Sequence, residues 1–316
     1  MDLHHCRAPA VRASTSERVL NLSVPQRLLA NIGTSFPVWI ERLPFIVADI
    51  EDRWDVTAGA PFDPGGEASW VAPARDSSGR DLVLKIAPTL PENRDEGLGL
   101  KLLQSAGAAR VYRSEWVGPA VTENDGPDAG TVSLLLERIR PGNTLRSLLA
   151  EPDHDEVVAE LLRSVWETNV DDVSLRPLNE LTALWAADFE TDVAAIADRI
   201  DAEVARDGVT MFRTLASQSD DRAFLFTDLH AENVLAGPSG WRLVDPKPYV
   251  GDRCYDVLQH LFNCRRFEDD PLTMIGRMAD LTSTDRDRLL AWAFARAVIE
   301  SSWDPRWIAT AHRLHS

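Results

Sequence analysis

Hydrophobic residues recur along the chain with two different periods, and the change between them separates a strand-rich part from a helical part. At residues 39–50 apolar side chains return every three or four positions, which predicts a helix that Pro44 would bend or divide. Residues 70–72, 81–86 and 131–139 are short apolar runs bounded by Gly-, Asp- and Pro-containing turns, which predicts antiparallel strands. A helix is expected at residues 94–104, with Leu98, Leu102 and Leu103 on one face.

From residue 143 onward the helical period dominates. It predicts helices that include residues 157–166, 181–204 and 289–303. Helices are expected to resume near residue 255 and to continue to the end of the chain, with 289–303 as the last clear one. A strand-like island interrupts them at residues 223–226, 234–236 and 241–244, with a polar loop at 227–232. The fold class expected is therefore α+β, with two lobes. Residues 1–22 are expected to form a flexible arm, residues 23–139 an N-terminal lobe with a leading helix, a small antiparallel sheet and the nucleotide cover, and residues 140–316 a mainly helical C-terminal lobe with the catalytic loop and the acceptor site.

Composition narrows the function classes. The chain has 316 residues, of which 44% are hydrophobic, so it can bury a sizeable core. Its 50 acidic and 33 basic residues give a net charge of −17. Nucleic acid is disfavoured as a partner, because a phosphate backbone requires a basic surface. An acidic surface suits a cationic small molecule, although the same charge would also arise if it served solubility alone.

The cysteines and the N-terminus point to a cytoplasmic protein. The chain has three cysteines, Cys6, Cys254 and Cys264. Because their number is odd and they lie far apart, a disulfide framework is not expected. No apolar run reaches the roughly 20 residues of a membrane span, and the first residues lack the apolar stretch of a secretory signal. His4, His5 and Cys6 are interpreted as an exposed terminus and not as a metal site.

Three side chains in and after the island have the spacing of a phosphoryl-transfer site. Asp228 and Asn233 lie five positions apart in the loop, and Asp245 ends the next strand. A hairpin would bring Asn233 and Asp245 side by side, and two such oxygen ligands with a nucleotide's phosphates suit Mg²⁺. Asp228 could then orient a hydroxyl group and accept its proton. The alternative is that all three are turn residues that bond their own backbone.

Lysine is rare in this chain, which has only Lys85, Lys101 and Lys247, so each one is a candidate for a role that Arg could not fill. Lys85 ends an apolar run and would point out of the sheet, with Glu96 on the following helix as its partner. The alternative for Lys85 is a solvated strand edge. Lys247 is interpreted as an exposed residue, with an activation-segment charge as the other possibility.

The order of these features resembles that of protein-kinase-like phosphotransferases. Residues 228–235, 244–256 and 66–69 are more specifically similar to the aminoglycoside phosphotransferases, in the branch of streptomycin 6-kinases and hydroxyurea phosphotransferases, and the similarity spans about residues 25–305. The resemblance implies that Asp228 is the catalytic residue, that Asn233 and Asp245 are metal ligands, and that Lys85 binds phosphates with Glu96 as its partner. It also implies that Gly65, Gly66 and Ser69 belong to a loop that covers the phosphates, and that backbone groups from Glu137 to Ile139 contact the adenine. Asp256 would bond the backbone of the catalytic loop.

Other positions depart from the family pattern or leave two interpretations open. Phe226 stands where most relatives have His, which removes a polar group behind the metal site, and Thr227 stands where Gly is common. Thr227 is expected to narrow the pocket or touch the acceptor. His230 either bonds nearby backbone or contacts the acceptor. Glu300 and Asp304 either line an acceptor pocket or lie on a solvated helix face.

The function expected from this resemblance is transfer of the γ-phosphoryl group of ATP, with GTP as the alternative donor, to a hydroxyl group of a small molecule, with Mg²⁺. The acceptor expected is a cationic, streptomycin-like aminoglycoside, whose phosphorylation would inactivate the drug. Alternative acceptors are hydroxyurea, a macrolide, choline or a sugar. A non-catalytic pseudokinase is a further alternative, whereas protein phosphorylation is disfavoured by the short segment between Asp245 and Asp256. No nucleic-acid or membrane partner is expected, and the protein is expected to be a monomer or a weak homodimer.

Overall fold

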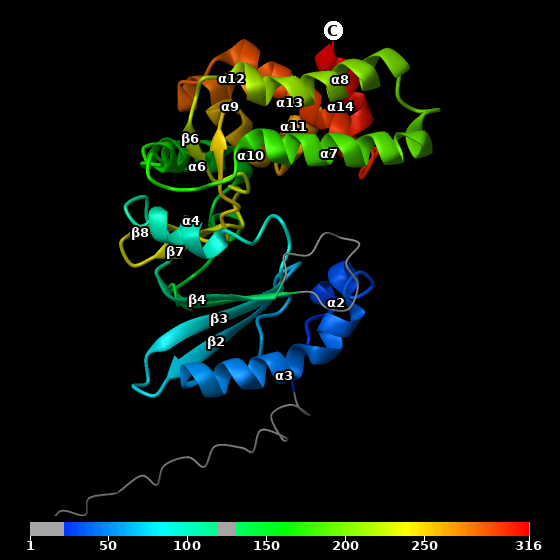
Figure 1. Cartoon of the computed structure of the whole chain (residues 1–316). Helices are drawn as coiled ribbons and strands as arrows, with labels where there is room; N and C mark the ends of the chain where they lie inside the picture. Colours follow the sequence, from blue (N-terminus) through cyan, green and yellow to red (C-terminus); the bar gives the residue numbers. More distant parts are fainter. Residues whose placement is uncertain (1–21, 119–129, 316) are drawn as a thin grey trace, which may run out of the picture. The chain divides into compact units, whose positions relative to one another are not determined.

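The computed structural model describes residues 22–118 and 130–315, so the predicted arm lies almost entirely outside the described residues, as do His4, His5 and Cys6. The chain divides into two compact units (Figure 1). The first runs to Arg94 and includes Tyr112–Arg138, and the second consists of Asp95–Val111 and the chain from Ile139. Residues 95–111 thus belong to the second unit, whereas the sequence placed them in the N-terminal lobe. The lobe boundaries given above stay a prediction.

The first unit contains a five-stranded sheet with the order β1-β2-β3-β5-β4. The pairs β1–β2, β2–β3 and β3–β5 are antiparallel, as the turns in the sequence predicted. Within β3 the residues Leu82, Leu84 and Ile86 face a core cluster, because successive side chains of a strand point to opposite faces. The strands are β1 Val56–Ala58, β2 Trp70–Asp76, β3 Asp81–Pro88, β4 Val111–Val117 and β5 Thr131–Glu137.

Helix α3, Pro37–Trp54, lies along one face of this sheet (Figure 1). It is preceded by α2, Gln26–Ile32. The helix continues across Pro44, so the expectation that this proline could divide it is wrong. Leu43 and Val47, on either side of Pro44, are buried in the same core cluster as the sheet residues. Their burial holds both halves of the helix against the sheet, although Pro44 has no backbone N–H to donate a hydrogen bond within the helix.

The second unit is mainly helical, which confirms the α+β fold class. Helices α8 and α13 approach each other closely at Gly208, where a Cβ atom would lie 2.3 Å from Cγ2 of Val298. The helices are α4 Glu96–Leu102, α5 Leu145–Leu148, α6 Glu151–Trp166, α7 Leu178–Asp192, α8 Ala202–Leu215, α9 Arg253–Asp256, α10 Leu258–Phe262, α11 Arg265–Asp269, α12 Pro271–Thr282, α13 Arg286–Glu300 and α14 Trp307–His315. No helix among the described residues is long and apolar enough to cross a membrane.

Two expectations about these helices are wrong at least in part. The single helix expected at residues 181–204 is two helices, because Asp201 accepts hydrogen bonds from the backbone N–H groups of Glu203 and Val204 and thereby begins α8. The leucine face expected for α4 is wrong for Leu98, which is exposed, whereas Leu103 is buried as expected, and Leu100 has no exposed surface either. Helix α14 follows the helix expected to be the last clear one, which agrees with the expectation that helices continue to the end of the chain.

Two short sheets in the second unit carry the candidate site. Strand β7, Val234–Gly237, pairs with β8, Gly240–Leu243, in the hairpin that the sequence predicted. Strand β6, Ala223–Leu225, pairs antiparallel with β9, Tyr249–Gly251. The sequence did not indicate β9, which has three residues and follows two prolines. The loop between β6 and β7 and the segment between β8 and β9 therefore start and end on paired strands.

Candidate active site

Asp256 holds the start of the loop that follows β6. Its carboxylate is buried and accepts hydrogen bonds from the backbone N–H groups of Phe226, at 3.0 Å, and Thr227, at 2.6 Å. Nε1 of Trp166 donates a third bond at 3.0 Å. Burial raises the pKa of Asp256 to about 6, although the backbone donors oppose the rise. The sequence predicted that Asp256 bonds the backbone of this loop, and the structure contains these bonds. They hold the start of the loop in place although position 226 is Phe and not His.

Thr227 adopts a left-handed backbone conformation with a φ of 55°. Such a φ favours glycine and is strained for a β-branched residue. The side chain compensates with a hydrogen bond, because the Thr227 hydroxyl donates to the carbonyl oxygen of Lys247 at 2.6 Å. Thr227 was expected to narrow a pocket or touch an acceptor, and its hydroxyl instead joins the loop to the segment after Asp245.

Asp228 is nearly buried, and one of its two carboxylate oxygens is held by neighbouring side chains. Oδ2 lies 3.1 Å from Nζ of Lys247 and accepts a bond from Nδ2 of Asn233 at 3.3 Å. The same Asn233 amide donates to the backbone oxygen of Asp228 at 2.9 Å. Oδ1 lies 3.8 Å from Nε2 of His230, which is longer than a hydrogen bond. Oδ1 is therefore the oxygen available to a hydroxyl group.

His230 is neutral at pH 7 in this setting. Burial lowers its pKa, and the nearby carboxylate of Asp228 opposes this only in part. The backbone N–H of Glu232 lies 3.4 Å from Nδ1 of His230, which places the ring proton on Nε2. The sequence left open whether His230 bonds nearby backbone or contacts the acceptor, and the structure contains the bond to the backbone.

Asn233 and Asp245 lie at the open end of the β7–β8 hairpin. The backbone N–H of Val244 donates to the carbonyl oxygen of Asn233 at 3.1 Å, which extends the pairing by one position and sets Asp245 directly after it. Asp245 has a φ of 62°, so the chain turns there. Because the nitrogen of the Asn233 amide faces Asp228, its oxygen is the atom on offer to a cation. An amide oxygen and a carboxylate are ligands that suit Mg²⁺.

Lys247 is the residue of this site that the sequence analysis missed. It was interpreted as exposed, but its side chain is only 33% exposed and forms the ion pair with Asp228. The signal that could have found it was already present, because the rarity of lysine that singled out Lys85 applies equally to Lys247. The interpretation was wrong because a residue two positions after a strand end is normally solvated, whereas here the segment returns to pair with β6.

The first unit carries five of the predicted nucleotide-binding residues. Lys85 is buried on β3 opposite Val71 and Leu134, on the sheet face turned away from the α3 core cluster. Gly65, with a φ of 77°, and Gly66 lie in the connection between β1 and β2, and a Cβ atom on Gly66 would lie 2.8 Å from Oγ of Ser69. Glu137 ends β5.

Glu96 and Ile139 belong to the second unit. Glu96 is buried at the start of α4, as predicted. This helix packs on the segment around Lys247, since a Cβ atom on Gly99 would lie 3.0 Å from Pro248 and 3.3 Å from Pro246.

The two candidate acceptor carboxylates are both paired with arginines. Glu300 forms an ion pair with Arg296, and its side chain is only 17% exposed, so the interpretation as a solvated helix face is wrong for Glu300. Asp304 is more exposed and lies 2.8 Å from Nε of Arg306. Neither carboxylate is therefore an uncompensated negative charge.

Solved structures with a similar fold include kinases. An ethanolamine kinase of Plasmodium vivax superposes with a TM-score of 0.56 at 13% identity, covering 98% of this chain and 92% of that one. An aminoglycoside phosphotransferase of Streptomyces rimosus, solved with ADP and streptomycin, gives a TM-score of 0.51 at 17% identity, covering 82% and 98%. These likenesses establish a protein-kinase-like fold, as expected from the sequence.

The family follows from the sequence itself. Residues 53–306 match the family of aminoglycoside/hydroxyurea antibiotic resistance kinases, and the chain belongs to that family. A streptomycin 6-kinase of Streptomyces glaucescens is 29% identical over 305 residues, 92% of both chains. A hydroxyurea phosphotransferase of Kitasatospora aureofaciens is 30% identical over 279 residues, 86% of this chain and 76% of the relative. The protein is therefore a phosphotransferase that acts on a hydroxyl group of a small molecule.

Proposed function

We propose that the protein transfers the γ-phosphoryl group of ATP to a hydroxyl group of a streptomycin-like aminoglycoside in the cytoplasm, and so inactivates the drug. The observation that carries this proposal is the Asp228 carboxylate, held by Lys247 and Asn233 on one oxygen and open on the other. The streptomycin 6-kinase relative, which aligns along 92% of its length, supports the choice of acceptor.

In this proposal Asp228 is the catalytic residue. It orients the acceptor hydroxyl group and takes its proton as the oxygen attacks the γ-phosphorus. Little covalent chemistry is required of the protein, so the rate depends on how well the loop fixes this carboxylate. The bonds from Asp256 to the backbone of Phe226 and Thr227 serve that purpose.

Asn233 and Asp245 would hold Mg²⁺ through the amide oxygen and the carboxylate. When bound, the ion neutralises charge on the nucleotide's phosphates. Lys85, with Glu96 as its partner, would bind the α- and β-phosphates, and the connection from Gly65 to Ser69 would cover them. Backbone groups between Glu137 and Ile139 would contact the adenine.

A second candidate acceptor is hydroxyurea or a related small neutral hydroxylamine. The hydroxyurea phosphotransferase relative favours it, as does the pairing of Glu300 and Asp304 with arginines. Both carboxylates were candidates for binding a cationic drug, and a neutral acceptor does not need them. The net charge of −17 favours the cationic acceptor instead, through its effect on encounter.

A transfer assay with the purified full-length protein tests these alternatives. Streptomycin, other aminoglycosides, hydroxyurea, a macrolide, choline and a sugar are each incubated with ATP and Mg²⁺, and phosphorylated product is identified by mass spectrometry. We expect product with streptomycin and none with the Asp228→Asn variant. Product with hydroxyurea alone would establish the second candidate. Nucleotide binding without product on any acceptor would overturn both and favour the pseudokinase alternative.

Salt dependence separates the two acceptors further. Attraction between an acidic protein and a cationic drug is screened as the Debye length falls from about 30 Å at 0.01 M salt to about 8 Å at 0.15 M. The KM for a cationic aminoglycoside should rise over this range, whereas the KM for neutral hydroxyurea should not. A bacterium sensitive to streptomycin should gain tolerance from the wild-type gene but not from the Asp228→Asn form.

A further inference from the structure

We propose that Lys247 is a positioning residue, which anchors Oδ2 of Asp228 together with Asn233 and so presents Oδ1 to the acceptor hydroxyl group. This inference rests on the proposed function, because it assigns a task to Lys247 within that reaction. It goes beyond that function by separating the two oxygens of Asp228 into an anchored atom and a reacting atom.

The contacts of Asp228 are distributed unequally between its oxygens. Oδ2 has an ammonium group at 3.1 Å and an amide donor at 3.3 Å. Among the residues that the structure describes, Oδ1 accepts no hydrogen bond, and Nε2 of His230 lies 3.8 Å from it. A carboxylate rotates about its terminal torsion with little preference, so two donors on one oxygen determine where the other oxygen lies.

The backbone of Lys247 is fixed on both sides of its side chain. Its N–H donates to the carbonyl oxygen of Phe226 at 3.0 Å, and its carbonyl oxygen accepts from the Thr227 hydroxyl at 2.6 Å. Pro246 and Pro248 flank it and pack against α4 at Gly99. Lys247 is thus tied to the two residues that immediately precede Asp228, and the ammonium group is held in place relative to the carboxylate.

The choice of lysine at this position fits a contact with one oxygen. An arginine guanidinium is a planar fork that tends to bind both oxygens of a carboxylate, whereas a lysine ammonium is a compact point charge. This chain uses arginine at all but three of its 33 basic positions. A fork at position 247 would occupy the oxygen that the acceptor hydroxyl group requires.

The reaction step assigns each atom. The acceptor oxygen forms a bond to the γ-phosphorus while its proton moves to Oδ1 of Asp228. The bond between the γ-phosphorus and the β,γ-bridging oxygen breaks, and ADP leaves with that electron pair. Oδ2 stays bonded to Lys247 and Asn233 throughout, so the carboxylate does not have to rotate during the transfer.

Lysine substitutions with separate kcat and KM measurements test this role. Lys247→Met removes the charge and keeps the length of the side chain, and we expect kcat to fall by roughly 10- to 100-fold, because misplacing a reacting group costs this much. The KM for ATP and for the acceptor should change by less than about twofold, since uniform binding is unaffected. Lys101→Met, a change at an exposed lysine on α4, is the control and should match the wild type.

Lys247→Arg distinguishes positioning from a simple ion pair. An ion pair that only stabilises the loop would tolerate arginine, whereas the positioning role predicts a loss of kcat close to that of Lys247→Met. Thr227→Val, which keeps the β-branched shape but lacks the hydroxyl group, should lower kcat, and Thr227→Ser should not. These loop variants keep the test valid if a Lys247 variant is poorly folded.

Three results would overturn the proposal. The first is full kcat in both Lys247→Met and Lys247→Arg. The second is a tenfold rise in the KM for ATP, which would make Lys247 a phosphate ligand. The third is additivity of Lys247→Met and Asp228→Asn, because a residue that acts through Asp228 has no further effect once that carboxylate is gone. Inactivity of the wild type on every acceptor would instead be a failure of the proposed function, so the two failures are distinguishable.

Discussion

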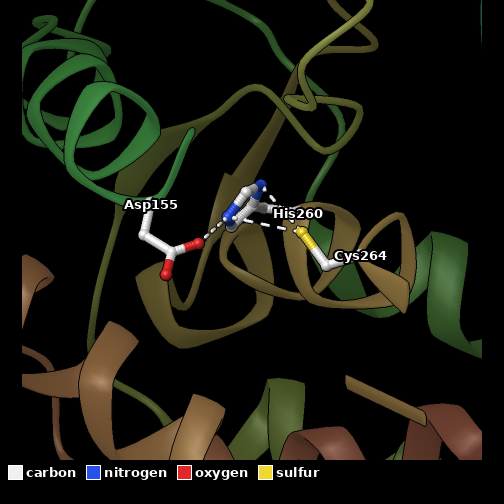
Figure 2. Close-up of side chains that lie close together, drawn as sticks. All are labelled: Asp155, His260 and Cys264. Carbon is white, nitrogen blue, oxygen red and sulfur yellow. Dashed lines mark hydrogen bonds and ion pairs between the residues drawn. The ribbon is translucent and has the colours of Figure 1, made fainter. Parts of the chain in front are cut away.

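Two buried aspartates of the second unit each form ion pairs, but Asp155 is bonded to several basic side chains through both oxygens and Asp228 to one cation through a single oxygen. Asp155 on α6 has no exposed surface and bonds His260 at 2.8 Å, Arg266 at 2.7 Å and Arg277 at 2.8 Å (Figure 2 shows its contact with His260 and the nearby Cys264). Asp228 has one cation on one oxygen. We call the first cluster, Asp155 with His260, Arg266, Arg277 and Cys264, the α6 hub.

The difference separates a stabilising cluster from a reactive one. In the α6 hub the partners come from α10, α11 and α12, so one carboxylate joins four helices. Burial alone would raise the pKa of Asp155, but the bonds from His260, Arg266 and Arg277 hold it well below its usual range. Asp228 is instead fixed by a loop and left incompletely bonded. A buried carboxylate oxygen that accepts no hydrogen bond lowers the stability of the fold. Such an oxygen is therefore typical of a site that binds a substrate.

The largest expected effect is a loss of kcat on substitution of Asp228. Asp228→Asn removes the proton acceptor but keeps the shape of the side chain, and we expect kcat to fall by about 10²- to 10⁴-fold. Steady-state kinetics with the identified acceptor measure this. The melting temperature and nucleotide affinity should stay near those of the wild type. A variant with at least half of the wild-type turnover would remove Asp228 from the reaction.

The corresponding change in the α6 hub should affect stability and leave the chemistry intact. Asp155→Asn removes the charge that balances Arg266 and Arg277, and we expect a loss of about 3 kcal/mol in the free energy of unfolding. This is the lower end of the cost of breaking a buried pair, because the two arginines are partly exposed and can be hydrated. Urea denaturation measures the loss.

Glu156→Gln is the matched control for the α6 hub. Glu156 is the next residue on α6, is 72% exposed and reaches Arg277 only at 3.4 Å, so its loss should change stability by less than about 1 kcal/mol. Equal destabilisation by the two substitutions would show that the charge of Asp155 has no special role. A loss of kcat in folded Asp155→Asn would contradict the separation of the two clusters.

The sequence predicted the local parts of the Asp228 site, but it indicated none of the contacts in the α6 hub. The β7–β8 hairpin follows from residues within about a dozen positions, because its turn and its apolar pattern are contiguous. The partners of Asp155 are 105 to 122 positions away, and no local period marks them. The division between α7 and α8 is different, because the sequence contains a local signal for it. Asp201 is a residue type that favours the N-cap of a helix, and it caps α8 in the structure.

The site shows the same limit. Asp228, Asn233 and Asp245 could be singled out by type and spacing within one hairpin. Lys247 lies in the same stretch of sequence, but its contact depends on β9 pairing back to β6. A three-residue strand has too little pattern to be predicted alone, so the tertiary pairing decided where the lysine lies.

Acid pH should separate the buried aspartates, because their pKa values shift in opposite directions. Asp155 has a folded pKa below its unfolded value, so its contribution to stability is present above about pH 4 and is lost as the pH falls further. Burial raises the pKa of Asp256 to about 6, so its contribution is present below about pH 4 and is lost as the pH rises through 6.

Urea denaturation between pH 3 and pH 7 measures both trends. The difference in unfolding free energy between the wild type and Asp155→Asn should shrink toward pH 3. The difference between the wild type and Asp256→Asn should be larger at pH 4 than at pH 7. Parallel pH curves for all three proteins would contradict the assigned shifts.

The smallest effect concerns metal ions at the α6 hub. Asp155, His260 and Cys264 have ligand atoms within 4.8 Å of one another, which is compatible with a metal site by distance alone. Their chemistry opposes one, because burial raises the pKa of the Cys264 thiol to about 12 and both oxygens of Asp155 are bonded to arginines. Zn²⁺ should therefore leave the melting temperature of the wild type unchanged, as should EDTA.

Mg²⁺ with a non-hydrolysable ATP analogue should raise the melting temperature, by mass action on the folded state, and the rise should be smaller in Asp245→Ala, which lacks one proposed ligand. The same titration with Cys264→Ser provides the comparison for zinc. If Zn²⁺ stabilised the wild type but not Cys264→Ser, the α6 hub would be a metal centre and not a closed ion-pair cluster. An unchanged wild type, together with a Mg²⁺-nucleotide shift that depends on Asp245, would assign cation binding to Asp245 and not to the α6 hub.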